Sequence, residues 1–112
     1  MTTVMNIRDL RHQRSGRLPS SLVQDEDAVY IGRANRRYAL PKSMWANPFA
    51  IGRDGARDEV IAKYRAWLLD HPLLLQRLRE LEGKTLICWC KPAACHGDVI
   101  AELVEALPGR GP

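Results

Sequence analysis

Residues 85–98 read TLICWCKPAACHGD, in which an apolar run leads through a short loop to a polar helix start. The run at 85–90 is rich in apolar and aromatic side chains, as a buried strand requires. After the loop at 91–94, apolar residues recur at helical spacing over 96–107, and Pro108-Gly109 ends this pattern. The segment therefore predicts a strand, a short loop and a helix.

The rest of the chain repeats this alternation of strands and helices. Residues 28–32, AVYIG, predict a second buried strand, and residues 3–7 predict a short first strand. Residues 58–70 carry apolar side chains at helical spacing after two acids, which predicts a helix. His71-Pro72 ends that helix, because the residue before a proline avoids the helical region. Residues 72–81 predict a further helix, for which proline is a favourable first residue.

The order of these elements predicts an α/β fold. Strand, long loop, helices, strand, short loop and helix is typical of a domain with a mainly parallel sheet. Continuous apolar strands agree, since parallel strands are covered on both faces. We therefore expect a single small Rossmann-like domain over residues 1–112, with helices flanking the sheet. Its folded core is expected at 28–107, and residues 12–21 are expected to form a mobile basic loop within 1–27.

Composition and charge favour a soluble cytoplasmic protein with an anionic partner. The 112 residues hold 17 Lys and Arg against 13 Asp and Glu, a net charge of +4. The positive charge gathers at 1–24 and 33–57, where no helical pattern is present. A basic loop region suits phosphates or other anions, although such loops are also common as solvated surface. No run approaches the roughly 18 apolar residues of a membrane span, so no membrane partner is expected.

The three cysteines, Cys88, Cys90 and Cys95, all fall within one short segment. An odd number grouped on one loop is not the disulfide framework of a secreted protein. Cys88 and Cys90 point to the same face of the strand, and Cys88 is expected to pack in the core. Cys90, Cys95 and His96 form the more natural cluster. Three interpretations of it stay open: a reactive or substrate-contacting loop, a zinc site, and structural packing.

Cys95 and His96 are the candidate catalytic residues. The unpaired N–H groups and the positive dipole end of a helix start stabilise a thiolate or a bound anion. We therefore expect Cys95 to be partly exposed, with a lowered thiol pKa, as a nucleophile or thiolate contact. His96 would act as an acid, a base or an orienting group.

Five further residues are the candidate substrate-binding residues. One of the two strong strands is followed by Gly32-Arg33 and the other by the segment 90–96, which holds two cysteines and a histidine. Ligands of open α/β sheets bind outside the carboxyl ends of the strands. The loop at 33–57 is also unusually long for a compact domain, which indicates a function. The substrate-binding set predicted on these grounds is Gly32, Arg33, Asn47, Cys90 and Gly97.

The segment Asn47-Pro48-Phe49 has two open interpretations. Pro48 restricts Asn47 to an extended conformation, and the Asn47 amide can donate and accept together, as reading a base edge requires. The alternative is a turn in which Trp45 and Phe49 pack into the core.

These motifs resemble a family of uncharacterised proteins. The segments VYIGR (29–33), WANPF (45–49), CWCKP (88–92) and CHGD (95–98) resemble those of small bacterial and phage proteins grouped as domain of unknown function 4326. The resemblance covers residues 28–107 and implies no established activity. The recurrence of the family in phages implies nucleotide or nucleic-acid metabolism as its setting, by association.

The last strand, loop and helix are also similar to those of a second uncharacterised group, domain of unknown function 488. In that group an arginine follows the Cys-His pair at the helix start. This chain has Gly97 at that position. Any anion-binding role of the arginine would fall here to Arg33 or Lys91.

Together these observations predict a protein that binds or processes a nucleotide, a nucleoside or a related anionic metabolite. Its site would be the Cys–His loop at the carboxyl edge of the sheet, and whether it is an enzyme stays open. One alternative is a basic nucleic-acid-binding accessory module, in which the N-terminal arginines and the loop at 33–57, with Arg36, Arg37 and Arg53, would contact phosphates. The other is a structural zinc domain, in which Cys90, Cys95 and His96 would hold the zinc ion. No other cofactor is expected.

Overall fold

A computed structural model describes residues 2–9, 28–38, 40–90 and 93–107. The loop expected at 12–21 lies outside these residues. The elements, in which η marks a 3₁₀ helix, are β1 (Thr3–Asn6), β2 (Ala28–Tyr30), η1 (Arg36–Tyr38), α3 (Arg57–Leu69), α4 (Pro72–Arg77), η2 (Leu78–Leu81), β3 (Thr85–Cys88) and α5 (His96–Glu105).

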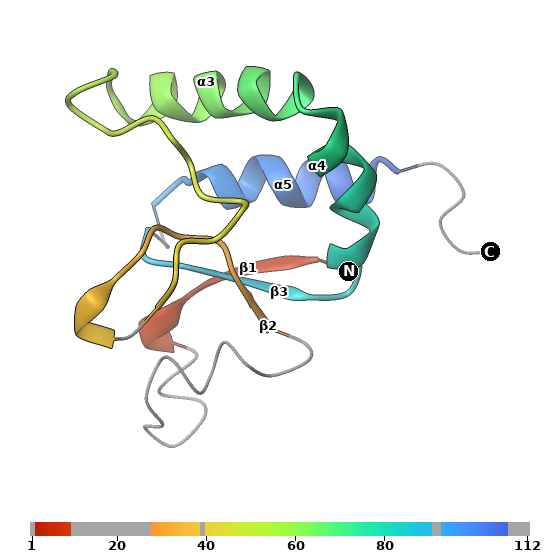
Figure 1. Cartoon of the computed structure of the whole chain (residues 1–112), viewed down its shortest axis with the longest axis horizontal. Coiled ribbons are helices and arrows are strands. Elements are labelled where there is room, and N and C mark those ends of the chain that lie inside the picture. The colour runs from red at the N-terminus through yellow and green to blue at the C-terminus, as the bar shows by residue number, and fades with distance from the viewer. Residues whose placement is uncertain (1, 10–27, 39, 91–92, 108–112) are drawn as a thin grey trace.

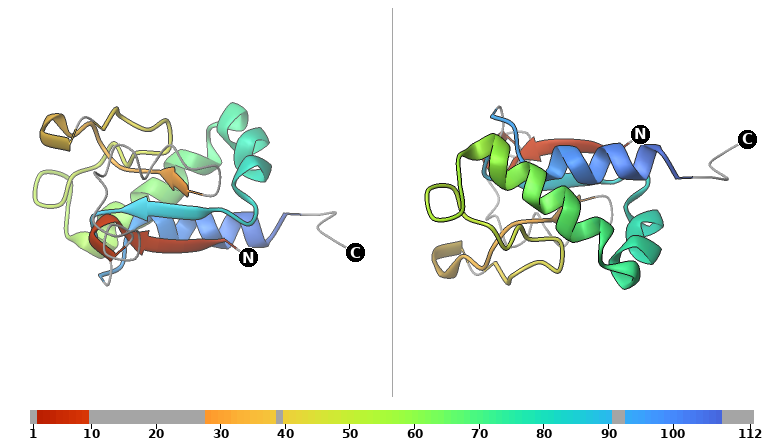
Figure 2. Two further views of the ribbon diagram at one scale, coloured as in Figure 1. Left: turned by 90° about the horizontal axis from the view of Figure 1, so that it is seen from below. Right: turned by 90° about the horizontal axis from the view of Figure 1, so that it is seen from above.

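The three strands form one parallel sheet with β3 in the centre. β3 pairs with β1 on one side and with β2 on the other, so that Val4 and Val29 both lie beside Leu86. Figure 2 shows β3 between the two outer strands. The expected α/β fold with a parallel sheet and helices is confirmed, and β1 adds a strand ahead of the core expected at 28–107.

Helices α3 and α5 lie on the same face of the sheet and pack against each other (Figure 1). Leu86 and Cys88 of β3 face this layer, where they meet Ile100 of α5. Tyr64 and Leu68 of α3 are fully buried in the same cluster. The helical spacing of apolar residues in the sequence therefore marks the face that each helix turns toward the sheet.

The opposite face of the sheet carries a smaller apolar cluster. Ile87 of β3 and Tyr30 of β2 are buried there together with Leu40, and Trp89 packs against them. Leu86 faces the helices while Ile87 faces the other way, so β3 is buried on both sides. This double burial accounts for the continuous apolar sequence of β3.

The helix boundaries follow the sequence signals with one difference. Glu59 accepts a hydrogen bond from the N–H of Ala56 at 2.9 Å, which fixes the start of α3. Pro72 begins α4, as predicted. The single helix expected over 72–81 is instead an α-helix to Arg77 followed by the 3₁₀ turn η2, and Gly83 ends it at a φ of +74°. None of the described helices is long and apolar enough to cross a membrane.

Candidate functional site

A cavity of about 400 Å³ opens at the carboxyl ends of β2 and β3. The residues after these strands, the long loop and the start of α5 all contribute to its wall. Convergence at this edge of the sheet is what open α/β folds favour. The lining includes six of the seven site residues predicted from the sequence: Gly32, Arg33, Asn47, Cys90, Cys95 and His96.

The cavity combines an apolar, aromatic surface with two positive charges. Phe49, Ile61 and Trp89 supply large apolar groups. Arg33 and Arg57 supply the charges, and no Asp or Glu is among the described lining residues. This combination suits a ligand that has both a flat or apolar part and an anionic part.

Backbone carbonyls hold both arginines in place. Nη2 of Arg33 donates to the carbonyl of Phe49 at 2.9 Å, and Nη1 of Arg57 donates to the carbonyl of Ala94 at 2.9 Å. Neither arginine takes part in an ion pair within the part of the chain that the structure describes. A guanidinium has five N–H donors, so each arginine retains donors, and its positive charge, for an anion.

His96 is a buried, neutral side chain, only 8% exposed. Its Nε2 lies 2.8 Å from the carbonyl oxygen of Ile31. Because a carbonyl only accepts, Nε2 carries the proton and Nδ1 carries the lone pair. Burial lowers the pKa of His96, and the positive charge of Arg33 lowers it further. The hydrogen bond to Ile31 raises the pKa, but the net shift is downward. The imidazole is therefore uncharged at neutral pH.

The second ring nitrogen of His96 is accessible from the cavity. Among the described residues, the bond to Ile31 is the one hydrogen bond of the ring, and the edge of Tyr64 packs beside it at 4.9 Å between ring centres. No buried side-chain nitrogen or oxygen in the described part of the chain lacks a partner. Nδ1 is thus reached by solvent, and His96 lines the cavity. It presents a hydrogen-bond acceptor there.

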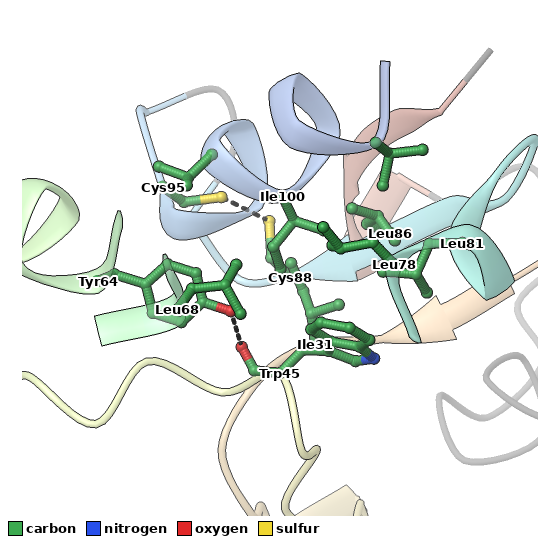
Figure 3. Packing of buried hydrophobic residues seen from close by; sticks show 12 residues of the cluster. Ile31, Trp45, Tyr64, Leu68, Leu78, Leu81, Leu86, Cys88, Cys95 and Ile100 are labelled. Carbon is green, nitrogen blue, oxygen red and sulfur yellow. Dashed lines mark hydrogen bonds between the residues drawn. The ribbon is translucent and has the colours of Figure 1, made fainter. Parts of the chain in front are cut away.

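The expectation of an exposed, acidified thiol at Cys95 is wrong. Cys95 is 2% exposed, and its sulfur lies 3.7 Å from that of Cys88. Figure 3 shows the two side chains pointing toward each other. Hydrogen bonding with Cys88 and Cys90, together with burial, raises the pKa of the Cys95 thiol. The N–H of Gly97 at the helix start does lower the pKa of Cys95, but hydrogen bonding with the Cys88 and Cys90 side chains and burial outweigh it. Cys88 is 1% exposed and packs in the core, as expected.

Cys95 has a structural task at the start of α5. Its sulfur accepts a hydrogen bond from the N–H of Gly97 at 3.3 Å, and its own N–H donates to the carboxylate of Asp98 at 3.1 Å. This reciprocal arrangement is a capping box with cysteine in the place of serine or threonine. The cap fixes where α5 begins, and so fixes the position of His96.

The two glycines of the predicted site serve close packing. Gly97 does not line the cavity, and a Cβ there would lie 2.8 Å from the side chain of Ile31 and 2.9 Å from that of Val4. At Gly32, which does line the cavity, a Cβ would lie 2.5 Å from the Tyr30 hydroxyl. Both positions lack a side chain because neighbouring side chains occupy the space.

Tyr30 occupies the space over Gly32 and fixes the chain after β2. Its hydroxyl donates to the carbonyl of Arg33 at 2.6 Å and accepts from Nε1 of Trp89 at 3.0 Å. Burial raises the pKa of Tyr30, so the hydroxyl remains a donor at neutral pH. This chain of two hydrogen bonds joins the ends of β2 and β3 beside the cavity.

Asn47 uses its amide within the protein. Its Nδ2 donates to the carbonyl of Val60 at 3.2 Å, and its Oδ1 accepts from the N–H of Phe49 at 2.9 Å. These bonds tie the long loop to α3. Trp45 is 3% exposed in the core, as the alternative interpretation of this segment predicts, whereas Phe49 is half-buried and lines the cavity.

Residues 15–106 match the family described as Domain of unknown function (DUF4326). The chain belongs to this family. This DUF4326 protein is also 33% identical over 70 residues to a protein of Enterobacteria phage T4, named "Uncharacterized 12.4 kDa protein in nrdA-td intergenic region". The match covers 58% of the chain and 63% of the phage protein, so the chain spans less than two thirds of that relative. No solved structure matches the chain.

The DUF4326 chain does not assemble the zinc ligands predicted from its sequence. Among the described residues, no three His, Cys, Asp or Glu side chains are placed to share a metal ion. Arg53 was predicted to contact phosphate in the nucleic-acid alternative. Its Nη2 lies 2.8 Å from Oδ2 of Asp54, and this ion pair partly neutralises the charge of Arg53.

Arg57, the second positively charged residue of the cavity of the DUF4326 protein, was not among the site residues predicted from the sequence. It is the first residue of α3 and stands beside two acids in the chain, which is typical of an ordinary exposed helix start. Its contact with Ala94 joins residues 37 positions apart. The one signal in the sequence is its membership of the basic segment 33–57.

Proposed function

We propose that this protein binds a nucleotide, a nucleoside or a related anionic metabolite in the cavity at the carboxyl ends of β2 and β3. One observation carries the proposal: Arg33 and Arg57 line this cavity, and no described residue pairs either of them with a carboxylate. An unneutralised pair of guanidiniums beside aromatic groups favours a phosphate- or carboxylate-bearing ligand. The volume of about 400 Å³ is within the usual range for small-molecule sites.

Each part of such a ligand has a matching group in the cavity. The anion would take two N–H groups from Arg33 or Arg57, since a guanidinium matches the geometry of a carboxylate or phosphate. A base or other flat ring would lie against Trp89 or Phe49. Nδ1 of His96 would accept a hydrogen bond from a ligand hydroxyl or N–H.

The proposal assigns different chemical roles to the two candidate catalytic residues. A neutral His96 with an accessible lone pair supports a role as acceptor or general base. The buried thiol of Cys95 supports an indirect role, in which its cap on α5 holds His96 in place. We also propose that the sheet uses its carboxyl edge for ligand binding in the manner of Rossmann-like domains.

A thermal-shift screen of nucleotides, nucleosides and sugar phosphates tests the proposal, because a ligand that binds only the native state raises its Tm. The informative variants are Arg33→Gln and Arg57→Gln. The matched control is Arg77→Gln, which removes the same charge from α4, where Arg77 pairs with Glu80 at 3.0 Å. Loss of one charge-assisted contact, about 1.5–3 kcal/mol, corresponds to about a 10- to 150-fold weaker Kd.

The expected result is a ligand whose Tm shift persists in Arg77→Gln and falls in at least one of the two cavity variants. The proposal is wrong if no compound in the screen shifts the Tm, or if the shift is the same in all variants. Including a short oligonucleotide separates the nucleic-acid alternative. Binding that falls steeply with salt but survives loss of Arg33 and Arg57 would favour that alternative.

A further inference from the structure

Three thiols lie together at one end of the cavity. Cys88, Cys90 and Cys95 all line it, and all three are free cysteines. The sulfurs of Cys88 and Cys95 are 3.7 Å apart and point toward each other from the end of β3 and the start of α5 (Figure 3). A disulfide joins sulfurs at about 2.05 Å. The two sulfurs must therefore approach by about 1.7 Å to reach bonding distance.

We propose that Cys88 and Cys95 form a peroxide-sensitive dithiol that closes to a disulfide within the folded protein. Cys95 hydrogen-bonds with both Cys88 and Cys90, and the sulfurs of Cys88 and Cys95 are 3.7 Å apart. One observation supports Cys88 as its partner over Cys90: Cys88 is the last residue of β3 and Cys95 is the cap of α5, so regular elements hold both, whereas Cys90 lies beyond the strand. Closing the pair needs no unfolding of either element.

Hydrogen peroxide supplies the oxidising equivalents. One thiol loses its proton, its sulfur bonds to a peroxide oxygen, and the O–O bond breaks to give a sulfenic acid and one water. The second thiol then loses its proton, and its sulfur attacks the sulfenic sulfur. The S–O bond breaks, a second water leaves, and the S–S bond remains. The two thiols lose two electrons in total, and one peroxide becomes two waters.

The cavity sets the route and the rate of this oxidation. Cys88 and Cys95 are 1% and 2% exposed, so an oxidant reaches them through the cavity that they line. Peroxide is close to water in size and is suited to that route, whereas bulky alkylating agents are not. Hydrogen bonding with Cys88 and Cys90, together with burial, raises the pKa of the Cys95 thiol, so attack by this thiol accelerates in alkaline solution.

The disulfide would change the start of α5. The sulfur of Cys95 accepts the Gly97 N–H in the reduced protein, and turning that sulfur toward Cys88 weakens this bond. His96 follows directly in the chain and lines the cavity. Oxidation therefore alters the wall of the cavity, whatever ligand the cavity takes.

The test treats the reduced full-length protein with hydrogen peroxide in the presence of a metal chelator. The chain has three thiols. We expect titration after denaturation to count three before treatment and one after it. Peptide mapping should join Cys88 to Cys95 within one chain, and dithiothreitol should restore all three thiols. A disulfide that contains Cys90, a link between chains, irreversible oxidation alone, or three unchanged thiols would each overturn the proposal.

Serine variants separate the pair from its neighbour. Cys95→Ser should keep the cap, because serine is a preferred N-cap residue, and should form no disulfide. Cys90→Ser is the matched control, since it removes a thiol from the same cavity and should leave disulfide formation within twofold of the unmodified rate. Loss of the disulfide in Cys90→Ser, with a melting curve that shows a folded protein, would contradict the assignment. Cys88→Ala gives the reciprocal loss, and Cys95→Ser carries the test if Cys88→Ala does not fold.

Discussion

Replacing Gly97 with alanine tests whether this glycine serves the packing of α5 on the sheet. The new Cβ would lie 2.8 Å from Cδ1 of Ile31 and 2.9 Å from Cγ1 of Val4, well inside the roughly 3.5–4.0 Å of a favourable carbon contact. Ile31 is fully buried in the apolar cluster between the sheet and the helices, so moving its side chain disturbs the packing of its neighbours. Overpacking of this kind costs about 1–3 kcal/mol. The better helix propensity of alanine returns up to about 1 kcal/mol, so the net loss should be about 1–2 kcal/mol.

Unfolding in urea measures this loss as a lower midpoint with an unchanged slope. Val4→Ala provides the control, because it removes the Cγ1 atom that the new methyl group meets. The double variant should be more stable than the sum of the two single losses by at least about 0.5 kcal/mol. A Gly97→Ala protein that is as stable as the wild type but no longer binds ligand would refute this reasoning. Gly97 would then be needed for close approach of the ligand to the backbone.

Three further predictions concern Tyr64, Asn47 and His96. Tyr64→Phe removes the hydroxyl that donates to the carbonyl of Trp45 at 2.7 Å. It leaves a buried acceptor unpaired, so we expect thermal unfolding to show a loss of about 1–3 kcal/mol. Asn47→Ala releases the long loop from α3. This should cost about 1 kcal/mol and should speed hydrogen exchange at the amide of Phe49. His96 has a folded pKa below its unfolded value near 6.5, so the unfolded state binds more protons between the two values. Stability should then fall as pH drops below about 6.5, by at most about 1.4 kcal/mol per pH unit. His96→Gln should lack this component, and equal losses in both proteins between about pH 7.5 and about pH 5.5 would contradict a buried neutral imidazole.

Most elements of the fold could be predicted because their sequences carry local signals. Apolar residues at helical spacing mark the buried faces of α3 and α5, and Pro72 and Gly83 mark the limits of the helical segment between them. The division of that segment at Arg77 could not be predicted. Leu75, Leu78 and Leu81 recur at intervals of three residues, which both an α-helix and a 3₁₀ turn place on one face.

The place of the candidate site could be predicted, but the state of its side chains could not. Parallel strands bring their carboxyl ends to one edge, so Gly32 and Cys90 had to lie near each other. The burial of Cys95 depends on Cys88 packing beneath it, which no pattern in the sequence specifies. Arg57 lines the cavity because the start of α3 lies close to the loop before α5. Both are properties of tertiary structure.

The central position of β3 also determines when the sheet can form. β1 and β2 meet only through β3, and Thr3 must wait for its partner Thr85, which is 82 residues later in the chain. During synthesis the two earlier strands therefore have open edges, which can pair with other chains. Closing such long loops makes parallel sheets slow to fold. A chain interrupted before residue 85 would hold the sequences of α3 and α4 but no sheet, so the cavity is the last part of the molecule to take shape.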